Sequence, residues 1–337
     1  MKRVFMQGLL LALVLLVGAG AAAFWWLQRP LPLAAPSVEL SIESGTAPRE
    51  IARDWVEAGV KVPPRLLYEW FRWSGEARKI RAGSYELRTG DTPVSLLRMM
   101  VRGDVTLATV RLIEGWNFRQ WRAELAKAEA LVPNTATMSD AELMAAVGAP
   151  GTVPEGRFFP DTYAYHKGAS DLSVLQRAHR AMQTRLEAAW AERDPKTPLK
   201  GPDEALTLAS IVEKETGQAE DRGKVAGVFV NRLRIGMPLQ TDPTVIYGLG
   251  EAFDGNLRKR DLQADTPYNT YTRRGLPPTP IAMPGKASLL AAVKPASTKA
   301  LYFVSRGDGS SVFSTNLDDH NRAVNKFQRG IGREAQR

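Results

Sequence analysis

Two glutamates, Glu213 and Glu215, stand two positions apart in the stretch ASIVEKETG, residues 209–217. They flank Lys214 and follow a mostly apolar run over residues 204–212. A carboxyl group beside apolar side chains has a raised pKa, so it can hold a proton near neutral pH. That property suits a general acid for a glycosidic oxygen. The alternative is a solvated helix end, where each carboxylate pairs with Lys214 or an arginine.

Helical geometry separates the two carboxyl groups. At about 100° per residue, Glu215 lies next to Ile211 and Val212. Glu213 falls on the opposite flank, about 160° away, so the two cannot act as a pair on one bond. The helical wheel favours Glu215 as the half-buried carboxyl but leaves both readings open.

Other common chemistries lack their residues. The chain has 337 residues and no cysteine, which excludes disulfides, thiolate nucleophiles and cysteine-bound zinc. Its three histidines, His166, His179 and His320, are far apart and form neither an HxH nor an HExxH pattern. No GxxxxGKS/T phosphate loop occurs. We therefore expect neither a metal nor another cofactor.

The N-terminus resembles a membrane anchor. Lys2 and Arg3 precede an uncharged stretch from Val4 to Leu27, which is long enough to cross a hydrocarbon core of about 30 Å as a helix. A cleaved signal peptide would have a shorter apolar core. We predict a cytoplasmic stub at 1–3 and a transmembrane helix at 4–28. The positive residues place the N-terminus in the cytoplasm and the rest outside it, as in a single-pass protein of a bacterial inner membrane.

Short strand and helix patterns follow a Pro-rich linker at 29–37. Residues 37–45 alternate as a strand, and 46–60 indicate an amphipathic helix capped by Thr46 or Ser44. Residues 79–90 indicate a strand pair, and 91–104 a helix capped by Asp91 or Thr92. A strand at 105–115 and a helix at 116–128 complete the series. The region 38–130 resembles glycan-binding LysM modules in size and order, and a generic small α+β domain fits the pattern equally well.

Residues 131–337 form the second predicted domain. In the stretch 153–170, four aromatic residues either line a sugar groove or fill a core: Phe158, Phe159, Tyr163 and Tyr165. Residues 203–234 indicate two helices, with Gly217 ending the first. Long loops rich in Pro, Gly and Thr follow, and long structured loops often carry function. A hairpin through 307–309 and a final helix close the chain. The predicted fold class is α+β.

Four long motifs resemble the endolytic murein transglycosylase family, whose members are also called YceG-like or MltG. The similarity covers most of residues 150–325, and the motifs are LASIVEKETG, VFVNRLRIGMPLQTDPTVIYGLG, TPYNTYTRRGLPPTPIAMPG and EGRFFPDTY. The resemblance implies a peptidoglycan lytic transglycosylase, which is a lyase, with a lytic-transglycosylase-type catalytic domain at 131–337.

The resemblance also implies functional residues. In this class one glutamate followed by serine or threonine makes both proton transfers, which places the role at Glu215 and leaves Glu213 as a neighbour. A Tyr-Asn pair near the acid corresponds to Tyr268 and Asn269. Further polar groups of the proposed substrate groove lie in LQTDPTVIYG: Gln240, Thr241, Asp242 and Tyr247. Asp242 before Pro243 is equally a good turn starter.

The implied reaction ends strand elongation by cutting nascent glycan strands internally, between N-acetylmuramic acid and N-acetylglucosamine, to leave 1,6-anhydro ends. One alternative is a hydrolytic muramidase, with Asp242 or Asp161 as the second carboxylate. Another is a non-catalytic wall-binding scaffold at the membrane. The net charge of +9 suits an anionic partner. The expected partners are glycan strands, the inner membrane and cell-wall synthases of the penicillin-binding class, and no nucleic acid.

Overall fold

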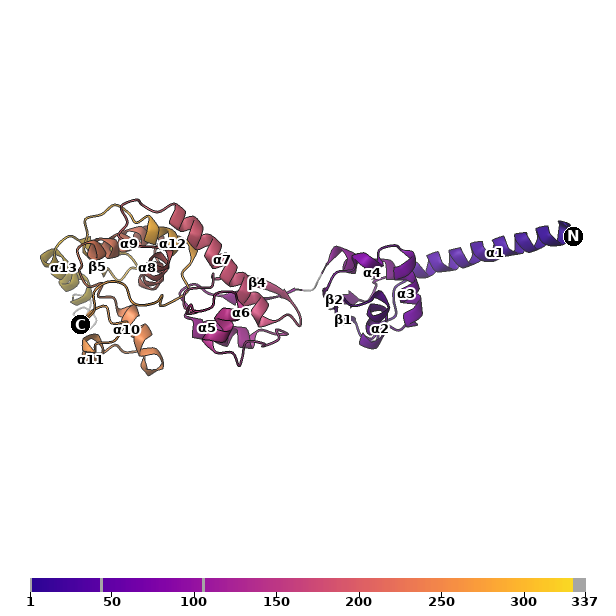
Figure 1. The fold of residues 1–337 in the computed structure, drawn as a ribbon, viewed down its shortest axis with the longest axis horizontal. Helices are drawn as coiled ribbons and strands as arrows, with labels where there is room; N and C mark the ends of the chain where they lie inside the picture. Colours follow the sequence, from indigo (N-terminus) through magenta and orange to yellow (C-terminus); the bar gives the residue numbers. More distant parts are fainter. Residues whose placement is uncertain (1, 43–44, 105–106, 330–337) are drawn as a thin grey trace, which may run out of the picture. The chain divides into compact units, whose positions relative to one another are not determined.

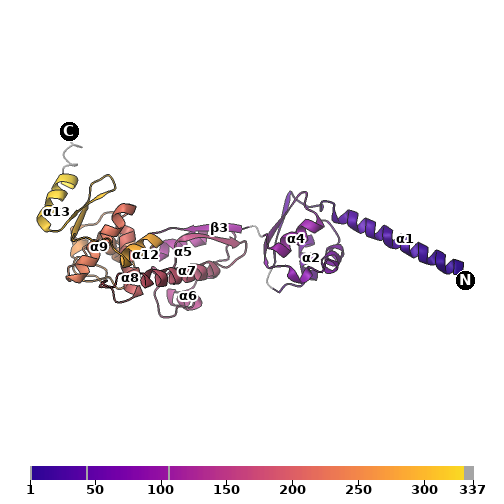
Figure 2. The same cartoon turned by 90° about the horizontal axis from the view of Figure 1, so that it is seen from above.

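The computed structural model of the chain describes residues 2–42, 45–104 and 107–329. The chain divides into two compact units (Figures 1 and 2). Unit 1 comprises Met1–Thr109, Glu129–Leu131 and Ala164–Ala169, and unit 2 comprises Val110–Ala128, Val132–Tyr163 and Ser170–Arg337. Helices and short two-stranded sheets occur in both units, so the predicted α+β class is confirmed.

Unit 1 is a small α+β body. Its elements are α1 (Lys2–Leu27), β1 (Ser37–Ile42), α2 (Pro48–Ala58), α3 (Pro64–Trp73), a 3₁₀ turn (Ala77–Lys79), β2 (Gly83–Arg88) and α4 (Pro93–Arg102). Strands β1 and β2 pair antiparallel, with Ser37 opposite Arg88 and Ile42 opposite Gly83. Residues 79–90 therefore contain one strand and not the predicted pair, because the partner of β2 lies more than 40 residues upstream.

The N-cap residues of α2 and α4 can be compared with the predicted caps. The Thr92 hydroxyl accepts the Ser95 N–H at 3.1 Å and caps α4, as predicted. The cap predicted for α2 is wrong at Thr46, because the N-cap residue is Ala47, whose N–H donates to the Glu50 carboxylate at 3.2 Å. Ser44, the other predicted cap, lies outside the described residues.

The N-terminal segment forms helix α1. In the part of the chain that the structure describes, no helix has both the length and the apolar character that crossing a membrane requires. The transmembrane helix expected at 4–28 stays a prediction.

Unit 2 contains the larger core. Its elements are the distal part of β3 (Leu107–Leu112), α5 (Phe118–Lys127), α6 (Asp140–Ala146), the first part of β4 (Asp161–His166), α7 (Asp171–Ala191), α8 (Pro202–Glu215), α9 (Ala219–Arg234), α10 (Asp242–Leu249), a 3₁₀ turn (Gly250–Ala252), α11 (Lys259–Gln263), α12 (Lys286–Val293), β5 (Tyr302–Ser305), β6 (Ser311–Ser314), α13 (Leu317–Val324) and a π-helical turn (Asn325–Arg329). β3 pairs with β4, and β5 forms an antiparallel hairpin with β6.

Helix α8 runs through the centre of unit 2 and packs against α7, α9 and α12. Every residue from Ala205 to Val212 is buried, because helix α8 has neighbouring elements on all sides. The run over residues 204–212 is therefore a core helix whose end delivers the two glutamates. Helix α8 ends at Glu215 with Thr216 as its C-cap, two residues before the predicted Gly217.

The aromatic stretch 153–170 belongs to the core. Phe158, Phe159, Tyr163 and Tyr165 are all buried, so they fill a core and do not line a groove. Phe158 stacks on Phe118 of α5, with ring centroids 5.2 Å apart. Residues 110–128, which the sequence pattern grouped with the LysM-like region, accordingly pack in unit 2.

Candidate active site

Glu215 sits where the core helix α8 ends. Its side chain is half-buried, and the Thr241 hydroxyl donates a hydrogen bond to Glu215 Oε1. Burial raises the pKa of the Glu215 carboxyl, and the charge of Asp242 acts in the same direction. The Thr241 hydrogen bond and the charge of Arg232 oppose this effect without reversing it. Glu215 therefore holds its proton at higher pH than an ordinary glutamate, as a general acid requires.

Thr241, the hydrogen-bond partner of Glu215, belongs to a cluster of three buried threonines. The Thr241 N–H donates to Thr270 Oγ1 at 3.1 Å, and the Thr244 hydroxyl donates to the Thr241 carbonyl at 2.8 Å. The hydroxyl oxygens of Thr244 and Thr270 are 2.9 Å apart. Each of the three side chains is at most 2% exposed. This cluster positions the Thr241 hydroxyl before any substrate arrives, which is how pre-organised sites are built.

The Glu213 side chain lies near the start of α12 and has neighbours other than those of Glu215. Its carboxylate accepts the Gly285 N–H at 2.9 Å, so it ties α8 to the start of α12. Burial and the nearby Glu213 charge raise the pKa of Glu114. The two glutamates of the EKE stretch therefore have separate neighbours, in agreement with their positions on the helical wheel.

The other residues of the LQTDP stretch differ in their positions. The Asp242 carboxylate is exposed and accepts the Tyr271 hydroxyl at 2.6 Å. Burial is the first cause that raises the pKa of Tyr271, followed by Asp242 itself. Gln240 is exposed and has φ +50°, a left-handed conformation that is uncommon for a residue other than glycine. In this stretch Thr241 is the residue that hydrogen-bonds to Glu215.

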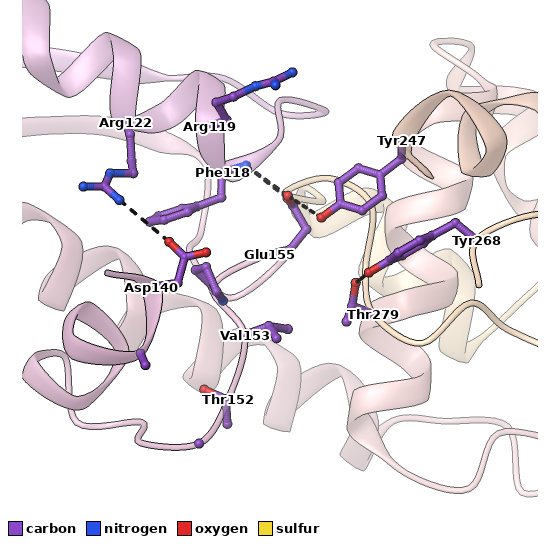
Figure 3. A pocket seen from close by; sticks show the side chains of 13 residues that line it. Phe118, Arg119, Arg122, Asp140, Thr152, Val153, Glu155, Tyr247, Tyr268 and Thr279 are labelled. Atoms are coloured by element: carbon purple, nitrogen blue, oxygen red, sulfur yellow. Dashed lines mark hydrogen bonds and ion pairs between the residues drawn. The ribbon is translucent and has the colours of Figure 1, made fainter. Parts of the chain in front are cut away.

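Tyr247 and Tyr268 line a pocket of about 640 Å³ in unit 2 (Figure 3). Their rings meet edge to face, with centroids 4.9 Å apart and planes at 63°. The Tyr247 hydroxyl donates to Glu155 Oε2 at 3.1 Å, and the hydroxyls of Tyr268 and Thr279 are 2.8 Å apart. Both predicted groove tyrosines therefore border a real cavity of the size that small ligands occupy.

Asn269 has a different environment from its neighbour Tyr268. Its side chain is fully buried, and its amide donates to three backbone carbonyls, those of Asp261, Leu262 and Ala264, at 2.6–3.2 Å. Its Oδ1 accepts the Tyr271 N–H at 2.9 Å. Asn269 organises the loop that carries Tyr268, and its contact with substrate stays a prediction.

Glu155 is the carboxyl group that sequence reasoning missed. It is 5% exposed, borders the same pocket, and accepts the Phe118 N–H with both oxygens at 3.2 Å (Figure 3). Burial raises its pKa to about 7. Asp161, the candidate chosen from the same EGRFFPDTY motif, is exposed at the start of β4. Glu155 is the first residue of the same motif, yet no neighbouring residue in the sequence indicates that it is buried.

Gly156 brings the Glu155 segment close to the loop around Pro280. It has φ +79°, and a Cβ at this position would lie 2.5 Å from the Pro280 Cβ. Only glycine combines that conformation with such a close approach. Glu155 is thus positioned at the pocket by the turn at Gly156 and by hydrogen bonds from Phe118 of α5 and Tyr247 of α10.

No group of three histidine or acidic side chains within the described ranges could hold a metal ion. The site consists of protonatable side chains and hydroxyl groups. A shielded carboxyl of this kind can transfer protons.

A half-buried carboxyl with a raised pKa at the end of a core helix is a candidate proton-transfer site on an α+β fold, and Lys214, its neighbour in the chain, lines a pocket together with Tyr247 and Tyr268. The YceG-like family model matches residues 40–326, and the chain belongs to this family. A YceG-like protein from Listeria monocytogenes has a similar crystal structure, with a TM-score of 0.54 and 26% identity over 85% of this chain and 98% of that one.

Two bacterial relatives named endolytic murein transglycosylase are similar in sequence. The one from Bacillus subtilis is 41% identical over 173 residues, which are 51% of this chain and 48% of that protein. The one from Streptococcus pneumoniae is 28% identical over 360 aligned positions, covering 96% of this chain and 65% of that protein. The chain thus spans about half to two thirds of the length of these relatives.

Proposed function

We propose that this chain is an endolytic peptidoglycan lytic transglycosylase that cleaves the bond between N-acetylmuramic acid and N-acetylglucosamine. The observation that carries the proposal is the half-buried Glu215 carboxyl, whose pKa is raised by burial and whose partner is the fixed Thr241 hydroxyl. The names of the two relatives support the same activity.

In the first half of the reaction, Glu215 donates its proton to the glycosidic oxygen. The bond between that oxygen and the muramyl anomeric carbon breaks, and positive charge develops on the carbon. N-acetylglucosamine leaves with the proton. Glu215 is now ionised, and the Thr241 hydroxyl stabilises the carboxylate by donating its hydrogen bond.

In the second half, Glu215 takes the proton from the 6-hydroxyl of the same muramyl sugar. The freed oxygen bonds to the anomeric carbon and closes a 1,6-anhydro ring, so no water is consumed and Glu215 regains its proton. An intramolecular nucleophile has the advantage of a held geometry. One carboxyl therefore suffices, whereas a hydrolase needs a second carboxylate for water or for a covalent intermediate.

The test is the mass of the products. The purified full chain and its Glu215→Gln variant are incubated with un-crosslinked glycan strands, and the released fragments are analysed by mass spectrometry. We expect ends one water lighter than reducing ends, and none from the variant. Ordinary reducing ends would identify a hydrolase and direct attention to Asp242, the charged neighbour of Glu215. Absence of cleavage by both proteins would favour the wall-binding scaffold.

The cellular setting is part of the same proposal. We infer that residues 4–28 anchor the protein in the inner membrane with a cytoplasmic N-terminus, that the catalytic unit acts in the periplasm, and that it shortens nascent strands beside cell-wall synthases. Support comes from Lys2, Arg3 and the uncharged stretch behind them. Carbonate extraction of membranes, with and without residues 1–28, tests the anchor. A full chain that is extracted as easily as the truncated one would refute it.

Unit 1 enters the proposal as a LysM-like module. Its strand and helix series and its own core are the features that support the resemblance. Binding of the isolated residues 29–109 to purified cell walls, or its absence, would decide whether unit 1 contacts glycan.

A further inference from the structure

We propose that the pocket around Glu155 is a sugar-binding subsite, in which the Glu155 carboxylate accepts a hydrogen bond from the acetamido N–H of an N-acetylhexosamine, while Tyr247 and Tyr268 contact the sugar ring. The subsite deepens the proposed function, on which it rests, because it would hold the glycan strand next to Glu215.

Glu155 is buried among hydrogen-bond donors. Both of its oxygens accept the Phe118 N–H, and Oε2 also accepts the Tyr247 hydroxyl at 3.1 Å. These donors favour the ionised form, yet no lysine or arginine of the described residues pairs with Glu155 at salt-bridge distance. An unpaired buried carboxylate is expensive to keep. A glutamine could accept the same Phe118 hydrogen bond without that cost, so packing alone gives no reason for the acid.

The pocket around Glu155 is one of a series. A neighbouring pocket of about 850 Å³ shares Arg119, Glu155, Tyr247 and Tyr268 with the 640 Å³ pocket. A third pocket of about 540 Å³ shares Val153 and Thr279 with the first. The three pockets therefore form a series with the 640 Å³ pocket in the middle, and Glu155 lies where the two larger ones meet. Such a series suits several linked sugar units better than one compact ligand.

The series of pockets reaches the end of α8, the helix that carries Glu215. Lys214 lines the 850 Å³ pocket and directly precedes Glu215 in the chain. Pro243 and Ile246 of α10 line the same pocket, and α10 begins just after Thr241, the partner of Glu215. A strand that occupies the pockets thus passes the end of α8 that carries the acid.

The lining of the pocket combines a carboxylate with two tyrosine rings. The hydroxyls of Tyr247 and Tyr268 are already bonded to Glu155 and Thr279, so their rings are what they offer to a ligand. Aromatic rings contact the apolar faces of sugar rings, and a carboxylate accepts an amide N–H with a charge-assisted hydrogen bond. An N-acetylhexosamine presents an apolar face and an amide N–H together.

The subsite has a characteristic pH dependence. Among the described residues, the other charged side chains that line the two pockets around Glu155 lie on α5, α6 and α8. Arg119 and Arg122 of α5 and Asp140 of α6 line the first pocket, and Lys214 of α8 lines the adjoining one. Asp140 also raises the pKa of Glu155. If the carboxylate form binds, a pKa of about 7 leaves roughly a tenth of the protein competent at pH 6 and nine tenths at pH 8. Binding should therefore be about tenfold tighter at pH 8 than at pH 6.

The experiment uses the full chain with Glu215→Gln, which separates binding from cleavage. Its dissociation constant for soluble un-crosslinked glycan strands is measured by calorimetry at pH 6 and pH 8. We expect a ratio of about ten between the two constants, and a ratio near one after Glu155→Gln is added. The matched control is Tyr163→Phe, which removes a buried hydroxyl bonded to the Phe159 carbonyl at 2.6 Å, and should keep the ratio of about ten.

A second variant guards against misfolding. Tyr247→Phe keeps the ring but removes a hydrogen bond that lowers the pKa of Glu155, so the pH midpoint of binding should move upward. The proposal is overturned if Glu155→Gln retains both the affinity at pH 8 and the ratio, or if Tyr247→Phe leaves the midpoint in place. Binding with this pH dependence but no cleavage by the native chain would instead count against the proposed reaction alone.

Discussion

Replacing Glu155 by glutamine should stabilise the protein at alkaline pH and have little effect at acidic pH. An ordinary glutamate has a pKa near 4.5, whereas burial raises that of Glu155 to about 7. Below pH 4.5 the carboxyl is protonated in both the folded and the unfolded chain. Between pH 4.5 and 7 the folded chain binds the additional proton, so the free energy of unfolding falls as pH rises.

The size of the effect follows from the two pKa values. At 1.36 kcal/mol for each pH unit, the interval from 4.5 to about 7 corresponds to about 3 kcal/mol. Above pH 7 the wild-type chain carries this whole cost, and glutamine carries none of it. Relative to wild type, Glu155→Gln should therefore gain about 3 kcal/mol between pH 4.5 and pH 8.5.

Urea unfolding at pH 4.5 and pH 8.5 measures the difference, because effects common to both proteins cancel. Glu187→Gln, which changes an exposed carboxyl on α7, is the matched control and should show a change near zero at both pH values. A stability difference between Glu155→Gln and wild type that does not depend on pH would refute the reasoning. It would mean that the Glu155 carboxyl titrates like one in water.

Three further substitutions test the site and its frame. Thr241→Val removes the hydroxyl that lowers the pKa of Glu215, so the alkaline limb of the pH–rate profile for strand cleavage should move to higher pH. A limb that stays in place would show that the hydroxyl does not act on Glu215. Asn269→Ala leaves three carbonyls without their donor and should lower the free energy of unfolding by about 2–4 kcal/mol in urea titrations, and a loss below about 0.5 kcal/mol would contradict its scaffold role. Gly156→Ala should lower the free energy of unfolding by about 2–4 kcal/mol, since the new Cβ would meet Pro280. The control is Gly151→Ala, which has φ +78° and open space around it and should lose only about 1–2 kcal/mol. Equal losses would mean that the Pro280 contact is unimportant.

The local elements were predictable because local patterns determine them. The alternation in 37–45, the Thr92 cap and the apolar run of α8 each depend on residues a few positions apart. The strand pair expected at 79–90 failed for the opposite reason. Strand β2 pairs with β1, and no short window contains both strands.

The same distinction applies to the site. The helical wheel alone favoured Glu215, since burial at the end of α8 depends on neighbours one turn away. Thr241 was chosen only as a groove residue, and its contact with Glu215 joins positions 26 residues apart. The environment of Glu155 is formed by hydrogen bonds from Phe118 and Tyr247, which are 37 and 92 residues away in the sequence. Nothing in the letters around Glu155 marks it as buried, so the structure was needed to find it.

Two carboxyl groups with opposite requirements predict the pH profile of the whole reaction. The proposed cleavage requires that Glu215 be protonated, whereas the proposed subsite requires that Glu155 be ionised. The product of these two fractions gives a bell-shaped dependence of kcat/KM on pH, whichever group titrates first. Glu155→Gln removes one requirement, so the bell should become a curve that is flat at low pH and falls only at high pH. A variant that retains both limbs would show that Glu155 does not control strand binding, and the acidic limb would then have to come from another group near Glu215.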